Sequence, residues 1–223
     1  MNRAVVLFSG GMDSATLLFQ AATQFDHITA LSFRYGAKHN AYELEACDRI
    51  LKHMTSRGIS TPIEHRVIDM ASCFTGFQSN LLKGGGAIPE GHYAAETMKL
   101  TVIPGRNLMF LSVAAGYAES VGASSVLIGV HLGDSHIYPD CREPFVKTAA
   151  GAIAFSSDNR VTLLAPFVNS TKNEIARIGQ ILSVPWHLTR SCYKDQELPC
   201  GKCGTCTERI EALGSIGVVE RKH

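Results

Sequence analysis

The chain lacks an excess of charge of either sign. Its 21 lysines and arginines stand against 20 acidic residues, so the formal net charge is +1 over 223 residues. Proteins that bind nucleic acid or membrane surfaces through bulk electrostatics carry a clustered basic patch. Only one tryptophan is present, and no stretch interleaves aromatic with basic side chains. We therefore expect no stable nucleic-acid complex, and an RNA-binding module is the weakest functional alternative.

Long apolar runs, repeats and low-complexity tracts are also missing. No window approaches the ~18 uninterrupted apolar residues that indicate a transmembrane helix. The first residues run directly into a strand-like block and do not form a signal-peptide pattern. These absences predict a cytoplasmic chain that does not associate with membranes. The length suits one large α/β domain with a substantial core, and a homodimer is an open expectation.

Cysteine is scarce outside one short segment. Four of the seven cysteines are Cys192, Cys200, Cys203 and Cys206. Zinc takes four thiolates at about 2.3 Å, and C-x2-C spacing is typical of structural zinc sites. A disulfide framework is typical of secreted chains instead, whereas an iron–sulfur cluster also accepts four thiolates. We predict a structural Zn2+ site that leaves no coordination position open for chemistry.

Buried-strand patterns alternate with helical patterns along the chain. The strand patterns occupy residues 4–8, 28–33, 62–68, 125–130 and 161–164, and the helical patterns occupy residues 15–25, 39–54, 108–121, 144–154 and 173–182. Such alternation predicts an α/β fold with a parallel, Rossmann-like sheet and helices on both faces. Ligands of such sheets bind at the carboxyl ends of the strands. We predict a nucleotide-binding domain over residues 1–185 and a zinc-binding segment packed on it over residues 186–223.

A glycine-containing turn follows the first strand and opens the first helix. Residues 9–14 have the sequence S-G-G-M-D-S. Consecutive glycines let backbone N–H groups approach an anion, the serines add hydroxyl donors, and the helix N-terminus adds positive potential. The turn is neither a Walker A motif nor a dinucleotide fingerprint, and a capped strand-to-helix turn is the structural alternative. We predict a phosphate-binding loop, in which Asp13 beside an anion indicates a mediating Mg2+ ion.

The whole chain resembles the 7-cyano-7-deazaguanine synthase (QueC) family of the PP-loop ATP pyrophosphatases. The resemblance rests on S-G-G-M-D-S at 9–14, Phe33 with Y-G at 35–36, P-G-R-N at 104–107, Y-P-D-C-R at 138–142, K-x-E-I at 172–175, and S-C-Y at 191–193 with the three later cysteines. It implies a Rossmann-like domain of the HUP type with a C-terminal zinc extension. The implied reaction converts 7-carboxy-7-deazaguanine and ammonia to the nitrile of queuosine biosynthesis. ATP with Mg2+ would adenylate first the carboxylate and then the amide.

The family pattern also assigns residues in this chain. Its nucleotide-binding segment maps onto Phe8, Ser9, Gly10, Gly11, Met12, Asp13, Ser14, Ala15, Thr16, Leu17 and Leu18. Its zinc ligands map onto Cys192, Cys200, Cys203 and Cys206.

Catalytic roles are predicted for three further residues. Arg106 opens a long helix, where a guanidinium can stabilise charge on phosphates or on an acyl-adenylate. Lys172 starts the last helix, where a cation opposes the helix dipole and so indicates a nearby anion. Asp134 follows a strand, at the mouth of the sheet. A solvated arginine cap and an exposed lysine are the structural alternatives for the first two.

Substrate contacts are predicted for Tyr35, Tyr138, Asp140 and Arg142. Asp140 can accept hydrogen bonds from a purine-like edge, and Arg142 can hold a carboxylate through two hydrogen bonds. A polar turn around Pro139 explains the same block equally well. His131 and His136 flank it, and we expect them to be core or solvated side chains.

Two segments depart from the family pattern. F-R-Y-G-A stands at residues 33–37 in place of F-D-Y-G-Q, and T-R-S stands at 189–191 in place of T-W-S. Arg34 and Ala37 motivate an alternative in which a related ligase stops at the amide or passes the acyl group to another amine, including one on a protein acceptor. A further segment, residues 81–99 with three consecutive glycines, is either a tolerated insertion or a lid over the site.

Overall fold

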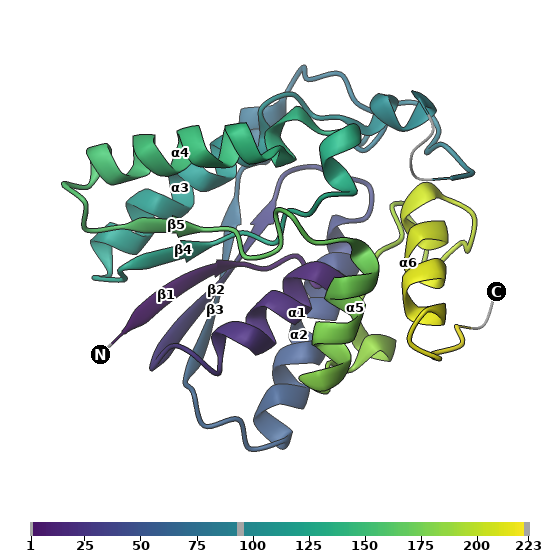
Figure 1. Cartoon of the computed structure of the whole chain (residues 1–223). Coiled ribbons are helices and arrows are strands. Elements are labelled where there is room, and N and C mark those ends of the chain that lie inside the picture. Colours follow the sequence, from purple (N-terminus) through teal and green to yellow (C-terminus); the bar gives the residue numbers. More distant parts are fainter. Residues whose placement is uncertain (1, 93–95, 221–223) are drawn as a thin grey trace.

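A five-stranded parallel sheet forms the centre of the computed structural model, which describes residues 2–92 and 96–220 (Figure 1). The strands are β1 (Arg3–Leu7), β2 (His27–Arg34), β3 (Ile63–Asp69), β4 (Ser125–Leu127) and β5 (Thr162–Leu164). Their spatial order is β3-β2-β1-β4-β5, and every neighbouring pair is parallel. The order changes direction between β1 and β4, and ligands of such sheets bind outside the strand ends at this switch point.

Helices cover both faces of the sheet. They are α1 (Met12–Ala21), α2 (Asn40–Ser56), α3 (Arg106–Ser120), α4 (Glu143–Ser156), α5 (Lys172–Ile181) and α6 (Gly204–Gly214). Figure 1 shows α3 and α4 on one face, α1, α2 and α5 on the other, and α6 beside α5 at the edge of the molecule. Short 3₁₀ turns occupy Ala71–Phe74, Glu96–Thr101, Asp134–His136, Pro139–Cys141 and Trp186–Leu188. The predicted α/β fold class is confirmed.

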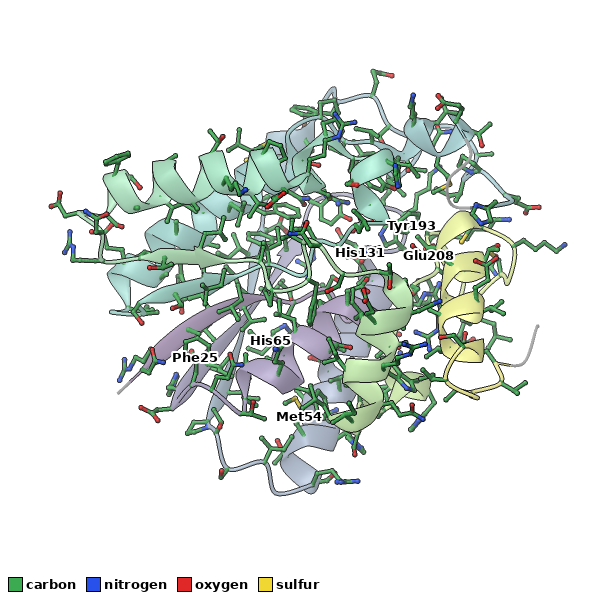
Figure 2. All side chains as sticks on the ribbon, viewed as in Figure 1. Phe25, Met54, His65, His131, Tyr193 and Glu208 are labelled. Atoms are coloured by element: carbon green, nitrogen blue, oxygen red, sulfur yellow. The ribbon has the colours of Figure 1, made fainter. Side chains whose placement is uncertain are left out.

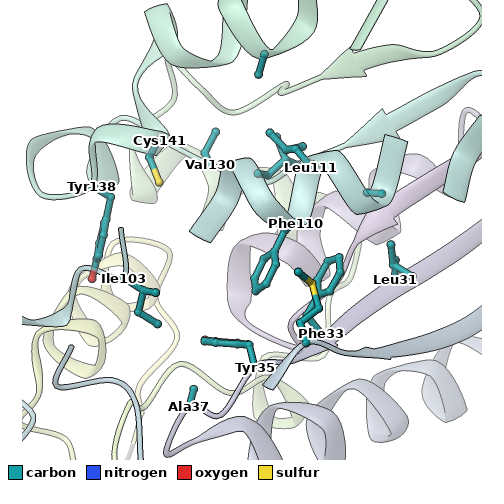
Figure 3. Close-up of a cluster of buried hydrophobic side chains, with 14 of the residues drawn as sticks. Leu31, Phe33, Tyr35, Ala37, Ile103, Phe110, Leu111, Val130, Tyr138 and Cys141 are labelled. Carbon is teal, nitrogen blue, oxygen red and sulfur yellow. The ribbon is translucent and has the colours of Figure 1, made fainter. Parts of the chain in front are cut away.

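The alternation of side chains along β1 explains why its sequence is uniformly apolar. Val5 belongs to the core cluster under α3 and α4, whereas Ala4 and Val6 belong to the cluster under α1, α2 and α5. Successive strand residues point to opposite faces, so a strand covered on both sides is apolar at every position. In the first cluster the rings of Phe33 and Phe110 stack with centroids 4.1 Å apart (Figure 3).

The boundaries differ from the sequence prediction at the ends of elements. The first helix begins at Met12, so part of the phosphate-loop motif is already helical. The fourth strand ends at Leu127, and Ile128 continues the pairing only through its N–H bond to the carbonyl of Leu164 (3.0 Å). Helix α6, inside the cysteine-rich segment, was not predicted. The division of the chain at residues 185 and 186 stays a prediction.

The glycine-rich segment at residues 84–86 is tied to the start of α2. The ammonium of Lys38 donates to the carbonyls of Gly85 (3.0 Å) and Gly86 (2.5 Å). Residues 93–95 of the predicted lid lie outside the described residues, and its closing role stays a prediction. None of the helices within residues 2–92 and 96–220 has the length and apolarity needed to cross a membrane.

Candidate active site

One cavity lies at the carboxyl ends of β1, β2 and β4, with a volume of about 210 Å³. Segments far apart in the sequence line it: the end of β1 with the phosphate loop, the start of α2, the start of α3, and residues of the cysteine-rich segment. The predicted site residues among its lining are Phe8, Ser9, Gly11, Met12, Asp13, Ser14, Tyr35, Arg106, Asp134, Tyr138 and Lys172. The remaining predicted nucleotide-binding residues do not line the cavity: Gly10, Ala15, Thr16, Leu17 and Leu18.

The phosphate loop has a fixed internal geometry. The hydroxyls of Ser9 and Ser14 lie 3.1 Å apart, and Ser14 Oγ donates to the carbonyl of Gly11 (3.2 Å). Gly11 is the N-cap of α1 and has no side chain with which to cap the helix. Gly10 adopts a φ of +74°, and a Cβ there would lie 2.7 Å from the carbonyl oxygen of Glu43. The loop can therefore press against α2 while it offers backbone N–H and hydroxyl donors to an anion.

A cluster of buried charges lies beside this loop. The ammonium of Lys172 is 2.6 Å from Asp13 Oδ2 and 3.3 Å from Glu208 Oε2. His131 Nε2 lies 3.4 Å from Asp134 Oδ2 and 3.3 Å from Lys172 Nζ. Figure 2 shows His131 and Glu208 converging at the strand ends beside α6. The position of Lys172 at a helix start predicted a nearby anion. Two carboxylates fill that role, Asp13 on α1 and Glu208 on α6.

The buried charges change one another's protonation. Burial acts against the charged form of Asp13, but Lys172 and His131 outweigh it and lower the pKa of this carboxyl. Burial likewise opposes the Lys172 ammonium, but Asp13 and Glu208 raise its pKa. Burial raises the pKa of Glu208, against the effect of Lys172. Ionised Asp13 and Lys172 therefore stabilise each other inside the cavity.

Arg106 occupies another wall of the cavity. Its guanidinium carbon lies 5.9 Å from the ring centroid of Tyr35. Burial alone would lower the pKa of the Arg106 guanidinium. Neighbouring groups, led by Tyr35 and Tyr193, outweigh burial and raise this pKa above its ordinary value, so the guanidinium stays charged. Tyr138 lines the same wall, and its hydroxyl lies 2.8 Å from Thr101 Oγ1. Arginine so placed can bind an anionic ligand through several donors.

The four clustered cysteines can hold a metal ion. Their sulfur atoms all lie within 4.8 Å of one another, and Cys200 Sγ is 3.9 Å from Cys206 Sγ. Four thiolates at the zinc–sulfur distance would stand about 3.8 Å apart in a tetrahedron. Backbone N–H groups also point at the sulfurs, such as that of Cys203 at Cys200 Sγ (3.2 Å). None of the four cysteines lines the cavity.

The cysteine-rich segment nevertheless forms part of the cavity wall through its other residues. Ser191, Tyr193, Thr205 and Glu208 line it. Arg190 joins the segment to the phosphate loop, because its backbone N–H donates to the carbonyl of Gly10 (2.8 Å). The Arg190 guanidinium donates to the carbonyls of residues 194, 196 and 197 and lies over the ring of Tyr42.

Two predicted substrate residues lie outside the cavity lining. Asp140 Oδ2 accepts a hydrogen bond from the backbone N–H of Asn107 (2.9 Å) at the start of α3. Arg142 Nε donates to the carbonyl of Ser135 (3.0 Å). Both side chains satisfy backbone groups, Asp140 at the start of α3 and Arg142 within its own turn, and their substrate contacts stay predictions.

Of the three residues that depart from the family pattern, Arg190 lines the cavity, whereas Arg34 and Ala37 do not. The Arg34 guanidinium is half exposed and pairs with Asp69 (3.3 Å) at the end of β3. Ala37 is fully buried and bridges to Leu82. Neither residue lines the cavity, so neither changes its chemistry by direct contact.

Sequence reasoning missed several residues of the cavity. His39 and Glu43 start α2 and line the wall opposite α3, and Glu208 comes from the unpredicted helix α6. His131 is 1% exposed, as expected of a core histidine, but it contacts the buried charges. The i, i+4 spacing of His39 and Glu43, which places both on one helix face, was the one sequence signal that pointed to a shared site.

Comparison with known proteins identifies the family of the chain. The 7-cyano-7-deazaguanine synthase of Caldicellulosiruptor saccharolyticus is 44% identical over 216 residues, covering 97% of this chain and 92% of the relative. That of Porphyromonas gingivalis is 45% identical over 215 residues, covering 96% and 94%. NMN synthetase from Francisella tularensis shares the fold alone, with a TM-score of 0.51 at 14% identity over 99% of this chain and 79% of that one. The family model described as queuosine biosynthesis protein QueC matches residues 3–217, and the chain belongs to this family.

Proposed function

We propose that the chain catalyses the ATP-dependent conversion of 7-carboxy-7-deazaguanine and ammonia to 7-cyano-7-deazaguanine. The observation that supports this best is a cavity that joins the phosphate loop to Arg106 and Lys172. The two relatives named above as that synthase match this chain over 92% and 94% of their own length. The proposal includes a place in queuosine biosynthesis and a cytoplasmic location, where ATP and ammonia are available.

The reaction consists of two activations at one carbon atom. The substrate carboxylate attacks the α-phosphorus of ATP, which releases pyrophosphate and leaves an acyl-adenylate. Ammonia then displaces AMP and gives the amide. The amide oxygen attacks a second ATP, again releasing pyrophosphate, and loss of AMP and a proton leaves the nitrile. Each nitrile therefore consumes two ATP molecules, and both activations suit the same phosphate site.

The chain's own residues supply binding and charge stabilisation for these steps. Backbone N–H groups of residues 9–14 and the Ser9 hydroxyl hold phosphate oxygens at the N-terminus of α1. Lys172 and Arg106 offset the negative charge that develops when pyrophosphate leaves. Asp134, through His131, keeps the buried cations in place. The aromatic wall of Tyr35 and Tyr138 excludes water from the activated acyl group.

The residues fit the two implied metal ions. Asp13 Oδ1 is buried and has no hydrogen-bond partner among the described residues, as expected of an oxygen that serves as a ligand of Mg2+. Bound Mg2+ supplies positive charge to the phosphates. Cys192, Cys200, Cys203 and Cys206 supply the four sulfurs of a Zn2+ site, and with all four positions filled the zinc acts as a structural ion.

Purified protein incubated with the deazaguanine acid, ammonium and ATP tests the proposal. Mass spectrometry is expected to show the amide followed by the nitrile, with two AMP formed for each nitrile. ATP consumption that ends at the amide, or transfer to another amine, would overturn the nitrile-forming assignment. The positions of Arg34 and Ala37 outside the cavity give no support to either of those outcomes.

A further inference from the structure

Glu43 places a carboxylate in the cavity wall without a strong cationic partner. It lies in the first turn of α2, and its side chain is 15% exposed. Its nearest ionisable partner is His39, whose Nε2 lies 3.5 Å from Glu43 Oε1. In the described part of the chain no lysine or arginine pairs with this carboxylate, in contrast to Asp13 and Glu208, which share Lys172. A half-buried carboxylate of this kind needs hydrogen-bond donors from elsewhere.

The carboxylate is held in a defined orientation. Asn40 Nδ2 donates to Glu43 Oε2 (3.2 Å) and to the carbonyl of Phe33 (3.1 Å), while Asn40 Oδ1 accepts from the N–H of Tyr35 (2.8 Å). The turn between β2 and α2 thus fixes Glu43. Each carboxylate oxygen has two acceptor positions, so after the contacts with Asn40 and His39 both oxygens can still accept a further donor.

The surroundings of Glu43 suit a flat heterocycle next to the phosphate loop. The rings of His39 and Tyr193 lie 4.9 Å apart and both line the cavity. Tyr35 lines the same cavity, and its N–H bonds to the Asn40 side chain that also holds Glu43. The close approach of Gly10 to the Glu43 backbone puts this wall alongside the phosphate loop.

The two ring systems of the proposed reaction differ at their edges. A deazaguanine presents a ring N–H and the exocyclic 2-amino group side by side, so it offers two adjacent donors to one carboxylate. Adenine presents its amino group beside an acceptor nitrogen, so only one of its edge atoms suits a carboxylate. Of the two ligands, the deazaguanine therefore matches both oxygens of Glu43.

We infer that Glu43 recognises the 2-amino-pyrimidinone edge of the deazaguanine acid and is the residue that selects this ring. The inference rests on the proposed function, because it takes the substrate class from it. A site that hydrogen-bonds a substrate N–H rejects analogues that lack the group, since its own polar atom is then left unpaired.

The test compares two substrates in two variants. The substrates are 7-carboxy-7-deazaguanine and the analogue that lacks only the 2-amino group. Wild-type protein is expected to prefer the former by roughly 10- to 100-fold in kcat/KM. Glu43→Gln should bring that ratio to within a few-fold of one. Gln Oε1 can still accept from Asn40, and thermal unfolding checks that the fold is kept.

Glu45→Gln is the matched control. Glu45 is on the same helix, is 61% exposed and pairs with Arg49 at the surface, so its variant should keep the wild-type ratio. If wild-type protein converts the acid but Glu43→Gln keeps the full preference, the inference is wrong. A raised KM for ATP with unchanged preference would instead place Glu43 at the nucleotide and also overturn it. If wild-type protein does not convert the acid at all, the proposed function is wrong. That result differs from the two outcomes that overturn only the role of Glu43.

Discussion

The phosphate loop and the cysteine-rich segment stand at opposite ends of the chain and meet at one cavity, but they contribute to it in different ways. The loop exposes its own defining residues, such as Ser9 and Asp13, to the cavity. The segment turns its defining thiols away and presents Tyr193 and Glu208 instead. The first motif thus acts through its own atoms, whereas the second acts by holding other residues in place.

Two contacts join these regions. The Arg190 N–H bonds to the Gly10 carbonyl, and Lys172 links Asp13 of the loop with Glu208 of α6. Misplacing the segment should therefore change the loop's charge environment, although no cysteine touches the site.

Replacing Lys172 should give the largest effect. Lys172→Met removes the cation that separates two buried carboxylates, so pyrophosphate formation should fall by about 10³-fold. The free energy of unfolding should also fall by about 3 kcal/mol, because Asp13 and Glu208 are left uncompensated. ATP–pyrophosphate exchange and urea unfolding measure the two effects. Lys147→Met, at an exposed ion pair on α4, should change neither pyrophosphate formation nor the free energy of unfolding. A similar loss in Lys147→Met would show that the effect is not specific to the buried Lys172.

Removing one thiol should reduce nitrile formation much more than ATP affinity. Cys206→Ser weakens the metal site, so Glu208 and Tyr193 shift, and nitrile formation should fall by about 10²-fold because of misplacement. ATP affinity, which depends mainly on the loop, should change by less than about tenfold. Metal analysis, nucleotide binding and product assays check this, with the exposed Cys73→Ser as control. Equal losses in ATP affinity and turnover would mean that the segment binds nucleotide directly.

The loop's close contact with α2 can be tested by adding one methyl group. Gly10→Ala combines a strained positive φ with a Cβ 2.7 Å from the Glu43 carbonyl, so it should cost about 2–4 kcal/mol of unfolding free energy. Gly58 also has a positive φ, of +69°, but no atom lies near its added Cβ. Gly58→Ala should therefore cost about 1 kcal/mol. Denaturant unfolding of both variants gives the difference, and equal costs would show that the contact is unimportant.

The pH dependence of stability should give the smallest effect. The folded-state pKa of Asp13 lies below its ordinary value of 3.8, so its contribution is complete above that value and is lost as pH falls through the folded pKa. The pKa of Lys172 lies above its ordinary 10.5, so its contribution is present below that value and is lost as pH rises beyond it. Asp13→Asn should therefore lose less stability than wild type between about pH 5 and pH 2. The exposed Asp158→Asn should follow the wild-type curve, and identical curves for Asp13→Asn would contradict the pairing.

The sequence predicted those parts of the structure that depend on local pattern. The apolar runs of β1 and β2 predicted a doubly covered parallel sheet, and S-G-G-M-D-S predicted a loop at the start of α1. The four cysteines predicted a cluster that can hold a metal. Each signal lies within one short segment, so periodicity and spacing were sufficient to find it.

What the sequence could not give depends on distant contacts. In the sequence, nothing distinguishes Glu208 from other helix residues. Only the fold shows that α6 places it beside Lys172. The same holds for Glu43, against whose backbone Gly10 packs. The Asp140 carboxylate likewise depends on a distant contact, because it accepts a hydrogen bond from the Asn107 N–H at the start of α3, and its substrate contact stays a prediction. In all three cases, sequence spacing does not show which groups lie nearest to a carboxylate.

A crystal structure with a non-hydrolysable ATP analogue and 7-carboxy-7-deazaguanine would show whether the loop and the cysteine-rich segment divide their roles in this way. We expect phosphate oxygens against residues 9–14 and Lys172, the heterocycle between Glu43 and Tyr193, and a metal held by four sulfurs with no ligand atom bound to it. Phosphates bound away from the loop, or a substrate atom coordinated to the metal, would contradict the division between a reactive loop and a structural cysteine-rich segment.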